Sequence, residues 1–488
     1  MSSTSIHRQQ RMEKSERLQE KGIEPYPARV ERTHTTAEAL EAFRENEEEG
    51  IHVAVAGRLM SIRVMGKSTF AHIRDGSGRL QIYLRYDSLG EERYELFCDE
   101  IDIGDFIQVE GELFRTRTGE TTVQVASWKL LAKALRPLPE KFHGLRDTET
   151  RYRQRYLDLI ANEDVREIFR TRTRIITALR HFLDERDFWE VETPILQPIY
   201  GGAAARPFTT YHNALDCTLY LRIADELYLK RLIIGGFDRV YEIGHNFRNE
   251  GISTEHNPEF TVMELYQAYA DYHDMMALVE ELYFTIAKQV LGSPMLTFEG
   301  QEIDLTPPWQ RITMRDAILQ QSGIDIQVYD EYERLWKVIR HKGLDVTEQP
   351  NWGKLVEKLF DEVVEPTLVQ PTFIMDYPIE ISPLAKKKPG TPRFVERFEH
   401  FIGGLECGNA FTELNDPLDQ RERFAAQKRA AREGDEEAHP MDEDFVVAME
   451  YGMPPTGGLG IGIDRMIMLF TDQSSIREVI LFPLLRQK

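Results

Sequence analysis

The residues with the clearest chemical potential lie in one run, FRNEGISTEHNPEFTVMELYQAYADY, from Phe247 to Tyr272. The pattern predicts a strand carrying Arg248, a hairpin loop from Ser253 to Asn257, and a return strand from Glu259 to Glu264. Such a hairpin places a guanidinium, an aromatic ring and carboxylates on one surface. Because a guanidinium grips carboxylate and phosphate groups through several donors at once, this surface suits an anionic nucleotide beside a cationic small molecule.

Two upstream segments could complete such a site. The run GGAAARPF, from Gly201 to Phe208, is poor in side chains, so its backbone can approach a ligand closely or form a plain loop. Glu226 opens an amphipathic helix in the run ELYLKRL. Its carboxylate could bind an amine, and it could equally be an ordinary helix N-terminal acid favoured by the helix dipole.

The downstream run RFEHFIGGLECGNAFTELND contains Glu399 and Glu406, with Asn409 and Glu413 on what the pattern predicts to be a buried strand. Two carboxylates beside phosphates suit Mg²⁺, although solvated carboxylates at strand ends would give the same spacing. Cys407 has no evident histidine partner. We therefore interpret it as structural, because free cysteines are commonly buried.

A glycine-rich strand runs into a helix in GLGIGIDRMIMLF, from Gly458 to Phe470, and Arg465 projects from the first helical turn. A helix N-terminus with an arginine favours an anion, and tight strand–helix packing is the alternative. The spacing matches neither a Walker phosphate loop nor a dinucleotide fold.

Composition limits the functional classes. The chain has 488 residues, 41% hydrophobic and 29% charged, and a formal charge of -22, which argues against a general nucleic-acid binder such as a DNA-binding protein. No apolar run is long enough to cross a membrane, and the polar N-terminus has no secretory core. Three widely spaced cysteines fit a reducing cytoplasm, so a cytoplasmic location is expected.

The elements that must position these residues fall into predicted regions. Residues 1–50 form a helical extension, and residues 51–135 form short alternating strands typical of a small closed barrel. Residues 136–150 form a linker rich in proline and glycine. Residues 151–488 form a second domain with a helical insertion at about 292–370. On the barrel, aromatic and basic side chains could stack on unpaired bases, although an ordinary solvated sheet face is the more common situation.

Taken in order, these segments resemble a class II (subclass IIb) aminoacyl-tRNA synthetase, specifically a lysyl-tRNA synthetase of the bacterial type. The resemblance covers nearly the whole chain and rests on RYRQRYLDL, GGAAARPF, ELYLKRL, FRNEG, HNPEFT, ELYQAYADY, ELND and GIGIDR. It implies an α+β protein with an N-terminal five-stranded OB-fold β-barrel. A class II catalytic domain, built on an antiparallel β-sheet flanked by helices, would follow.

The resemblance also implies a reaction. L-lysine and ATP would form lysyl-adenylate and pyrophosphate, and lysine would pass to the 3′ terminal adenosine of tRNA(Lys). Mg²⁺, up to about three ions with ATP, would be the cofactor. A homodimer is implied as well.

Residue roles are carried over position by position. Arg248 and Arg465 would be catalytic, Arg248 bridging the lysine carboxylate and the α-phosphate, and Arg465 holding the γ-phosphate. The ATP site would also contain Glu250, His256, Asn257 and Phe260, with Glu399 and Glu406 holding the metal. The remaining lysine-binding residues would be Gly202, Glu226, Glu264, Tyr266, Asn409, Phe411 and Glu413. On the barrel, Arg63, Phe70 and Gln81 would meet the anticodon.

Two positions depart from the family pattern: Asp225, where proline is usual, and Asp187, where glycine is usual. Three alternative functions remain open from sequence. An aspartyl or asparaginyl relative is disfavoured by carboxylates at Glu264 and Glu413. A lysine ligase acting on a protein is disfavoured by the barrel, and a non-enzymatic RNA-binding module by the intact arginines and acids.

Overall fold

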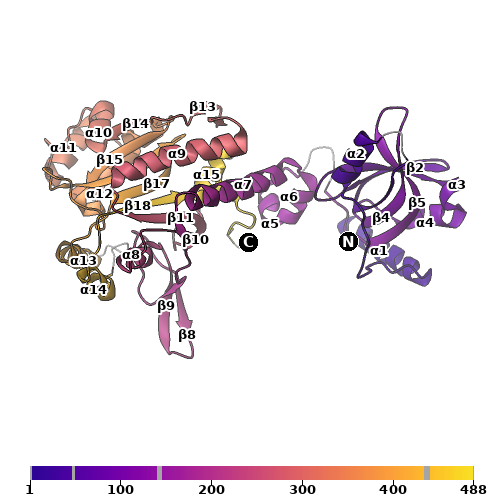
Figure 1. Ribbon diagram of the computed structural model, residues 1–488, viewed down its shortest axis with the longest axis horizontal. Helices are drawn as coiled ribbons and strands as arrows, with labels where there is room; N and C mark the ends of the chain where they lie inside the picture. The colour runs from indigo at the N-terminus through magenta and orange to yellow at the C-terminus, as the bar shows by residue number, and fades with distance from the viewer. Residues whose placement is uncertain (1–2, 47–49, 140–144, 433–439, 487–488) are drawn as a thin grey trace. The chain divides into compact units, whose positions relative to one another are not determined.

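The computed structural model describes residues 3–46, 50–139, 145–432 and 440–486. Two compact units divide the chain, Met1–Arg146 and Asp147–Lys488. Each is described by itself (Figure 1). Within the described residues, no helix combines the length and the apolar character needed to cross a membrane.

The first unit is a closed five-stranded barrel with strand order β1-β2-β3-β5-β4, and only the β3–β5 pairing is parallel among those described. Alternating side chains fill its interior, as the predicted period of two requires. Its strands are β1 His52–Met65, β2 Ser68–Arg74, β3 Arg79–Arg85, β4 Phe106–Arg115 and β5 Thr121–Ala132. Its helices are α1 Ser3–Glu20, α2 Thr36–Glu45, α3 Tyr86–Leu89 and α4 Glu91–Glu100.

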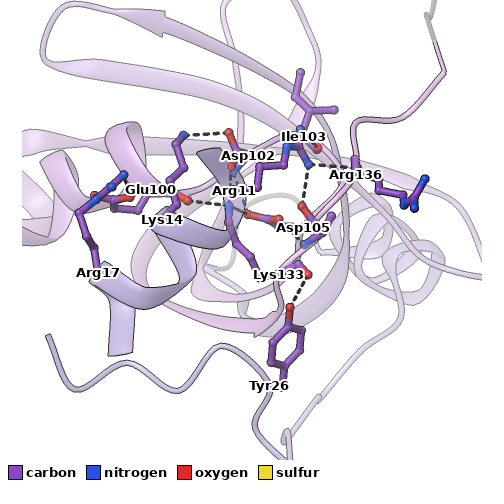
Figure 2. A network of polar contacts seen from close by, with 11 residues as sticks. Arg11, Lys14, Arg17, Tyr26, Glu100, Asp102, Ile103, Asp105, Lys133 and Arg136 are labelled. Atoms are coloured by element: carbon purple, nitrogen blue, oxygen red, sulfur yellow. Dashed lines mark hydrogen bonds and ion pairs between the residues drawn. The ribbon is translucent and has the colours of Figure 1, made fainter. Parts of the chain in front are cut away.

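A polar network ties α1 to the barrel (Figure 2). Arg11 donates to the carbonyl oxygens of Ile103 and Ala134 at 3.1 and 2.9 Å. Lys14 pairs with Asp102 at 2.9 Å, and Asp102 also pairs with the buried Lys133. The N-terminal helix is therefore an integral part of the barrel unit.

The second unit is built on an eight-stranded sheet of order β14-β15-β16-β17-β18-β11-β10-β6. Its interior pairings are antiparallel, and the two edge pairings, β14 with β15 and β6 with β10, are parallel. The sheet strands are β6 Trp189–Glu190, β10 Arg239–Phe247, β11 Glu259–Ala268, β14 Gln310–Thr313, β15 Thr372–Pro378, β16 Phe394–Ile402, β17 Leu405–Thr412 and β18 Thr456–Gly462. Smaller sheets contain β7 Leu196–Gln197, β8 Thr209–His212, β9 Cys217–Leu221, β12 Met295–Phe298 and β13 Gln301–Asp304.

Helices cover this sheet on both sides. Figure 1 shows α7 and α9 along one side, where their apolar faces join β11, β16, β17, β18 and α15 in the largest core. The helices are α5 Thr148–Arg153, α6 Arg155–Ala161, α7 Asp164–Asp184, α8 Glu226–Ile234, α9 Tyr272–Leu291, α10 Met314–Ser322, α11 Tyr332–Lys342, α12 Trp352–Val363, α13 Pro417–Arg432, α14 Glu443–Glu450, α15 Ile463–Phe470 and α16 Ile476–Val479, with short 3-10 turns at Glu365–Thr367 and Ile379–Ile381.

Two sequence expectations are modified here. The region 292–370 is not wholly helical: it begins with the β12–β13 hairpin, and β14 joins the edge of the main sheet before α10, α11 and α12 follow. Short polar strands such as Gln310–Thr313 give little periodic signal, because only four residues alternate. Arg248 does not lie on the strand but follows its last residue, Phe247.

Candidate active site

One face of the central sheet forms the floor of a cavity of about 460 Å³. The register aligns Glu264 with Gly460, Gly460 with Asn409, and Asn409 with Glu399 across four strands. Two residues along each strand, Tyr266, Gly458, Phe411 and Arg397 form a second row. Because side chains alternate between faces, both rows point to the same side, and all these residues line the cavity.

Glycines in the middle strand make room for this floor. A Cβ on Gly458 would lie 1.9 Å from Glu413 Oε1 and 2.5 Å from a ring carbon of Tyr266. A side chain at this position would therefore displace a cavity carboxylate. Strand β18 needs glycine at position 458 because the side chains of Glu413 and Tyr266 occupy the space where a Cβ would lie.

The structure brings together every predicted site residue of the second unit. All of them line this cavity, from Gly202 on the loop before α8 to Arg465 on α15. The three barrel residues, Arg63, Phe70 and Gln81, belong to the other unit.

At the end of the cavity predicted to hold a nucleotide, the guanidinium of Arg248 lies 5.1 Å from the centre of the Phe260 ring. The backbone N–H of Arg248 donates to Pro258 O at 2.9 Å, which closes the hairpin loop of residues 249–258. Arg248 Nε is buried and finds no hydrogen-bond acceptor among the described residues. An orphaned donor inside a cavity is costly, so it indicates a position that an anionic ligand would satisfy.

Arg465 joins the hairpin loop to the far end of the cavity. Its guanidinium donates to Glu406 Oε2 at 3.0 Å and lies 3.2 Å from His256 Nε2. Ser253 Oγ accepts from the backbone N–H of His256 at 3.0 Å and so shapes the loop. Glu250 is exposed at the rim of the cavity.

Glu399 and Glu406 are the candidate metal ligands. Tyr377 donates to Glu399 Oε2 at 2.7 Å, and Arg397 pairs with the other oxygen at 2.5 Å. Burial raises the pKa of Glu399; burial acts the same way on Glu406, but Arg465 brings the pKa of Glu406 below its usual value.

The described residues contain no group of three or more histidine, cysteine, aspartate or glutamate side chains arranged to hold a metal ion. Two neighbouring carboxylates fit Mg²⁺ only where phosphate and water oxygens complete the shell. The two carboxylates alone therefore do not make a complete metal site within the described residues.

At the opposite end, carboxylates surround a buried lysine that sequence reasoning missed. Lys230 contacts Glu226 one helical turn earlier on α8, and its Nζ lies 2.5 Å from Glu413 Oε2. All three side chains are at most 5% exposed. Burial raises the pKa of Glu413 to about 8 despite Lys230. The spacing of four within ELYLKRL was the available signal, since residues four apart share a helix face.

Glu264 completes this end of the cavity. Tyr266 Oη lies 3.5 Å from Glu264 Oε2, and the backbone N–H of Asp225 donates to Glu264 Oε1 at 3.3 Å. Burial, followed by the neighbouring Asp225, raises the pKa of Glu264 well above its usual value. Gly202 has a φ of 89°, and a Cβ there would lie 3.0 Å from Glu226 Cβ, so glycine permits its close approach.

Asp225 does not add a free charge to the cavity. Its carboxylate is fully buried and lies 3.1 Å from Arg222 Nε, and it is not among the described residues that line the cavity. Burial raises the pKa of Asp225 to about 7. Burial also raises the pKa of Cys407 to about 12, which agrees with a structural thiol.

The predicted insertion contributes residues that the sequence gave no reason to select. Asn351, Lys354 and Glu357 of the α12 region line the cavity, and burial raises the pKa of Glu357 to about 7. Without the fold, nothing linked this amphipathic helix to the hairpin about a hundred residues earlier.

On the barrel, Phe70 stacks on Tyr83 with ring centres 4.5 Å apart, and Arg63 is paired with Phe70 in the strand register. Gln81 uses both ends of its amide, donating to Glu120 at 2.6 Å and accepting from Thr122 at 2.7 Å. The three predicted residues therefore share one face. Glu120 is an addition that the sequence reasoning did not select.

Comparison with known proteins agrees with this architecture. Residues 147–486 match the family model of class II tRNA synthetases (D, K and N), and residues 53–131 match that of the OB-fold nucleic acid binding domain. The chain therefore belongs to the class II tRNA synthetase family and also contains an OB-fold nucleic acid binding domain. Both matches confirm the fold class predicted from sequence.

Proteins named lysine–tRNA ligase are similar along nearly the whole chain. That of Pelotomaculum thermopropionicum is 58% identical over 98% of this chain and 94% of its own length. Those of Roseiflexus castenholzii and Bacillus subtilis are 58% and 53% identical, over 98% of this chain and 98% and 97% of their own lengths.

Proposed function

We propose that this protein is a lysine–tRNA ligase that activates L-lysine with ATP and transfers it to the 3′ terminal adenosine of tRNA(Lys). One observation carries the proposal. A single cavity holds the guanidinium of Arg248, whose buried Nε has no hydrogen-bond acceptor among the described residues, and the buried carboxylates Glu226, Glu264 and Glu413. The full-length similarity to proteins named lysine–tRNA ligase supports it.

Charge explains the choice of amino acid. A desolvated ammonium needs anionic partners, and Glu264 and Glu413, with Tyr266, would receive the ε-ammonium. Glu226 and the backbone of Gly202 would receive the α-amino group, while Asn409 and Phe411 shape the space between. Aspartate or asparagine would bring no side-chain ammonium, which would leave Lys230 as the single cation among three buried carboxylates and disfavours an aspartyl or asparaginyl specificity.

The first step needs no general base, because the lysine carboxylate is itself the nucleophile at the α-phosphorus. Catalysis is therefore positioning and charge neutralisation. Arg248 would contact both the lysine carboxylate and the α-phosphate, Phe260 would stack on adenine, and Arg465 would hold the γ-phosphate. Glu250, His256 and Asn257 would surround the nucleotide.

Glu399 and Glu406 would hold Mg²⁺, which neutralises phosphate charge when bound. The tyrosine and arginine bonds on Glu399 orient that carboxylate toward the cavity floor. Arg465 lowers the pKa of Glu406, so this carboxylate is ionised at neutral pH while its Oε2 accepts a hydrogen bond from Arg465.

On the barrel, Arg63, Phe70 and Gln81 would meet the anticodon, since an aromatic platform with a nearby cation suits unpaired bases. A homodimer is part of the proposal. It is supported by exposed apolar side chains after α7, namely Trp189, Ile195 and Leu196, which are 64%, 46% and 49% exposed. A cytoplasmic location fits a chain with three free cysteines.

The deciding experiment is amino-acid-dependent exchange of pyrophosphate into ATP, across a full panel of amino acids. Lysine is expected to support exchange, and ornithine, one methylene shorter, to be disfavoured by only about 10–200-fold. Exchange with another amino acid and none with lysine would contradict the proposal. Charging of tRNA(Lys), compared with a protein acceptor, separates tRNA ligation from protein modification.

A further inference from the structure

The C-terminal segment Ile476–Leu484 touches the hairpin loop of residues 249–258 at two points. The backbone N–H of Ile476 donates to Thr254 O at 2.7 Å. The backbone N–H of Leu484 donates to Asn257 Oδ1 at 3.3 Å. These contacts join parts of the chain that are more than two hundred residues apart, as the numbering shows.

The second contact gives the side chain of Asn257 a different use from the one predicted. Its Nδ2 donates to Glu259 O at 2.5 Å while its Oδ1 accepts from Leu484. Asn257 is only 7% exposed. Both ends of the amide are therefore engaged in holding the loop between the start of β11 and the C-terminal segment.

Helices α5 and α6 fix the C-terminal segment from the other side. Arg155, at the start of α6, is fully buried and donates to the carbonyl oxygens of Arg477, Ile480 and Leu481 at 2.6, 3.3 and 3.1 Å. Its remaining nitrogen pairs with Asp158 at 2.6 Å. An arginine that binds three carbonyls of one segment fixes its backbone, which has only the short helix α16 as regular structure.

Arg172 of α7 ties the same segment to the cavity. It donates to Val479 O at 3.1 Å, to Asp464 Oδ1 at 2.6 Å and to Thr261 Oγ1 at 2.9 Å. Asp464 precedes Arg465, and Thr261 follows Phe260. The C-terminal segment thus belongs to one hydrogen-bonded network with the elements that present both nucleotide-facing groups.

We propose that the segment Ile476–Leu484 is a positioning element for ATP, in which the Leu484 amide, anchored through Arg155, holds the hairpin loop in its nucleotide-binding form. The reason is entropic: a ten-residue loop ordered before ATP arrives does not lose that freedom on binding. This inference rests on the proposed function, because it concerns the same ATP site.

Leu484→Pro tests the contact, because proline removes the N–H donor while the chain continues. In lysine-dependent pyrophosphate exchange by the full chain, the KM for ATP is expected to rise about 3–10-fold, the effect of one hydrogen bond. The KM for lysine should stay within about two-fold, since the amino-acid end has no contact with the segment among the described residues.

Two controls separate the donor from other effects. Leu484→Ala keeps the N–H and shortens the side chain. Leu485→Pro introduces proline at the next position, whose N–H makes no hydrogen bond within the described residues. Both should leave the KM for ATP near that of the unmodified protein. If Leu484→Pro and Leu485→Pro raise that KM equally, or neither does, the inference is wrong.

Hydrogen exchange supplies a readout that does not depend on activity. Without ATP, the amides of Ser253 and His256, which are bonded within the loop, should exchange faster in Leu484→Pro than in Leu485→Pro. Unchanged exchange would also overturn the inference. An unmodified protein inactive with lysine would instead refute the proposed function, so the two failures are distinguishable.

Discussion

Lys230 Nζ lies 2.5 Å from Glu413 Oε2, and both side chains are inaccessible to solvent. Because Lys230 also contacts Glu226, one internal ammonium bridges carboxylates assigned to opposite ends of the amino acid. With every group ionised, Glu226, Glu264 and Glu413 together with Lys230 carry two net negative charges. That number equals the two ammonium groups of a bound lysine.

Replacement of Lys230 by methionine is expected to weaken both folding and lysine binding. Removing one partner of a buried ion pair leaves uncompensated charge and costs about 3–5 kcal/mol of unfolding free energy. The KM for lysine should rise about 10-fold or more, because Glu226 and Glu413 lose the cation that fixes them. Urea unfolding and pyrophosphate exchange measure the two effects.

Arg334→Met is the matched control for that change. Arg334 also pairs with an acid four residues away, Asp330, but both side chains are more than 50% exposed. An exposed pair contributes about 1 kcal/mol or less. If the Lys230 and Arg334 variants unfold at the same urea concentration, the buried ion pairs of Lys230 contribute no more to the free energy of unfolding than the exposed pair of Arg334.

Glu399→Gln is expected to lower kcat/KM for ATP about 10–100-fold and to raise the Mg²⁺ concentration needed for half-maximal exchange. The amide keeps the shape but offers a weaker, neutral donor to the metal. Glu396→Gln is the control, because Glu396 lies on the same strand but three residues away, on the opposite face. Equal Mg²⁺ dependence of the two variants would contradict a metal role for Glu399.

Features set by interactions between residues close in sequence could be predicted, and features set by contacts between distant segments could not. The barrel and the helix α7 were predictable, because alternation and helical periodicity are local signals. The order of the segments that resemble the family, from RYRQRYLDL to GIGIDR, also predicted the class II fold, which the comparisons confirm. The roles of individual residues remain predictions.

Contacts between distant segments left no such signal. The bond of Leu484 to Asn257 joins two irregular stretches, and the carbonyl contacts of Arg155 depend on backbone geometry alone. The cavity wall from α12 was missed for the same reason, since amphipathic periodicity states which face is buried but not what it packs against. Lys230 was missed as well, although its four-residue spacing from Glu226 was visible in the sequence.

Asp225→Asn is expected to change the pH dependence of stability. The folded pKa of Asp225, about 7, lies above the ordinary value of 3.8, so the folded state holds the proton more tightly. The stability from this group is complete below about pH 4 and is lost as pH rises toward 7. The unmodified protein should therefore lose on the order of 1–4 kcal/mol more than the variant over this window.

Urea unfolding between pH 4.5 and 7.5 measures this difference. Asp345→Asn, an exposed aspartate of the same unit, is the control and should leave the curve unchanged. A parallel course of the Asp225→Asn and unmodified curves would show that Arg222 keeps Asp225 ionised throughout, contrary to the expectation.

Asp187→Gly is expected to stabilise the second unit by about 0.5–1 kcal/mol. Asp187 has a φ of 59°, a left-handed conformation that costs a residue with a Cβ about 1–2 kcal/mol. Glycine removes this cost, but it loses more conformational entropy on folding, which offsets part of the stabilisation. Two residues earlier, Glu185 has a φ of -63°, so Glu185→Gly should instead destabilise by about 0.5–1 kcal/mol. Urea midpoints of the two variants should shift in opposite directions, because glycine relieves left-handed strain at position 187 and relieves none at position 185. Shifts of the same sign would mean that Asp187 makes a compensating interaction stronger than its backbone strain.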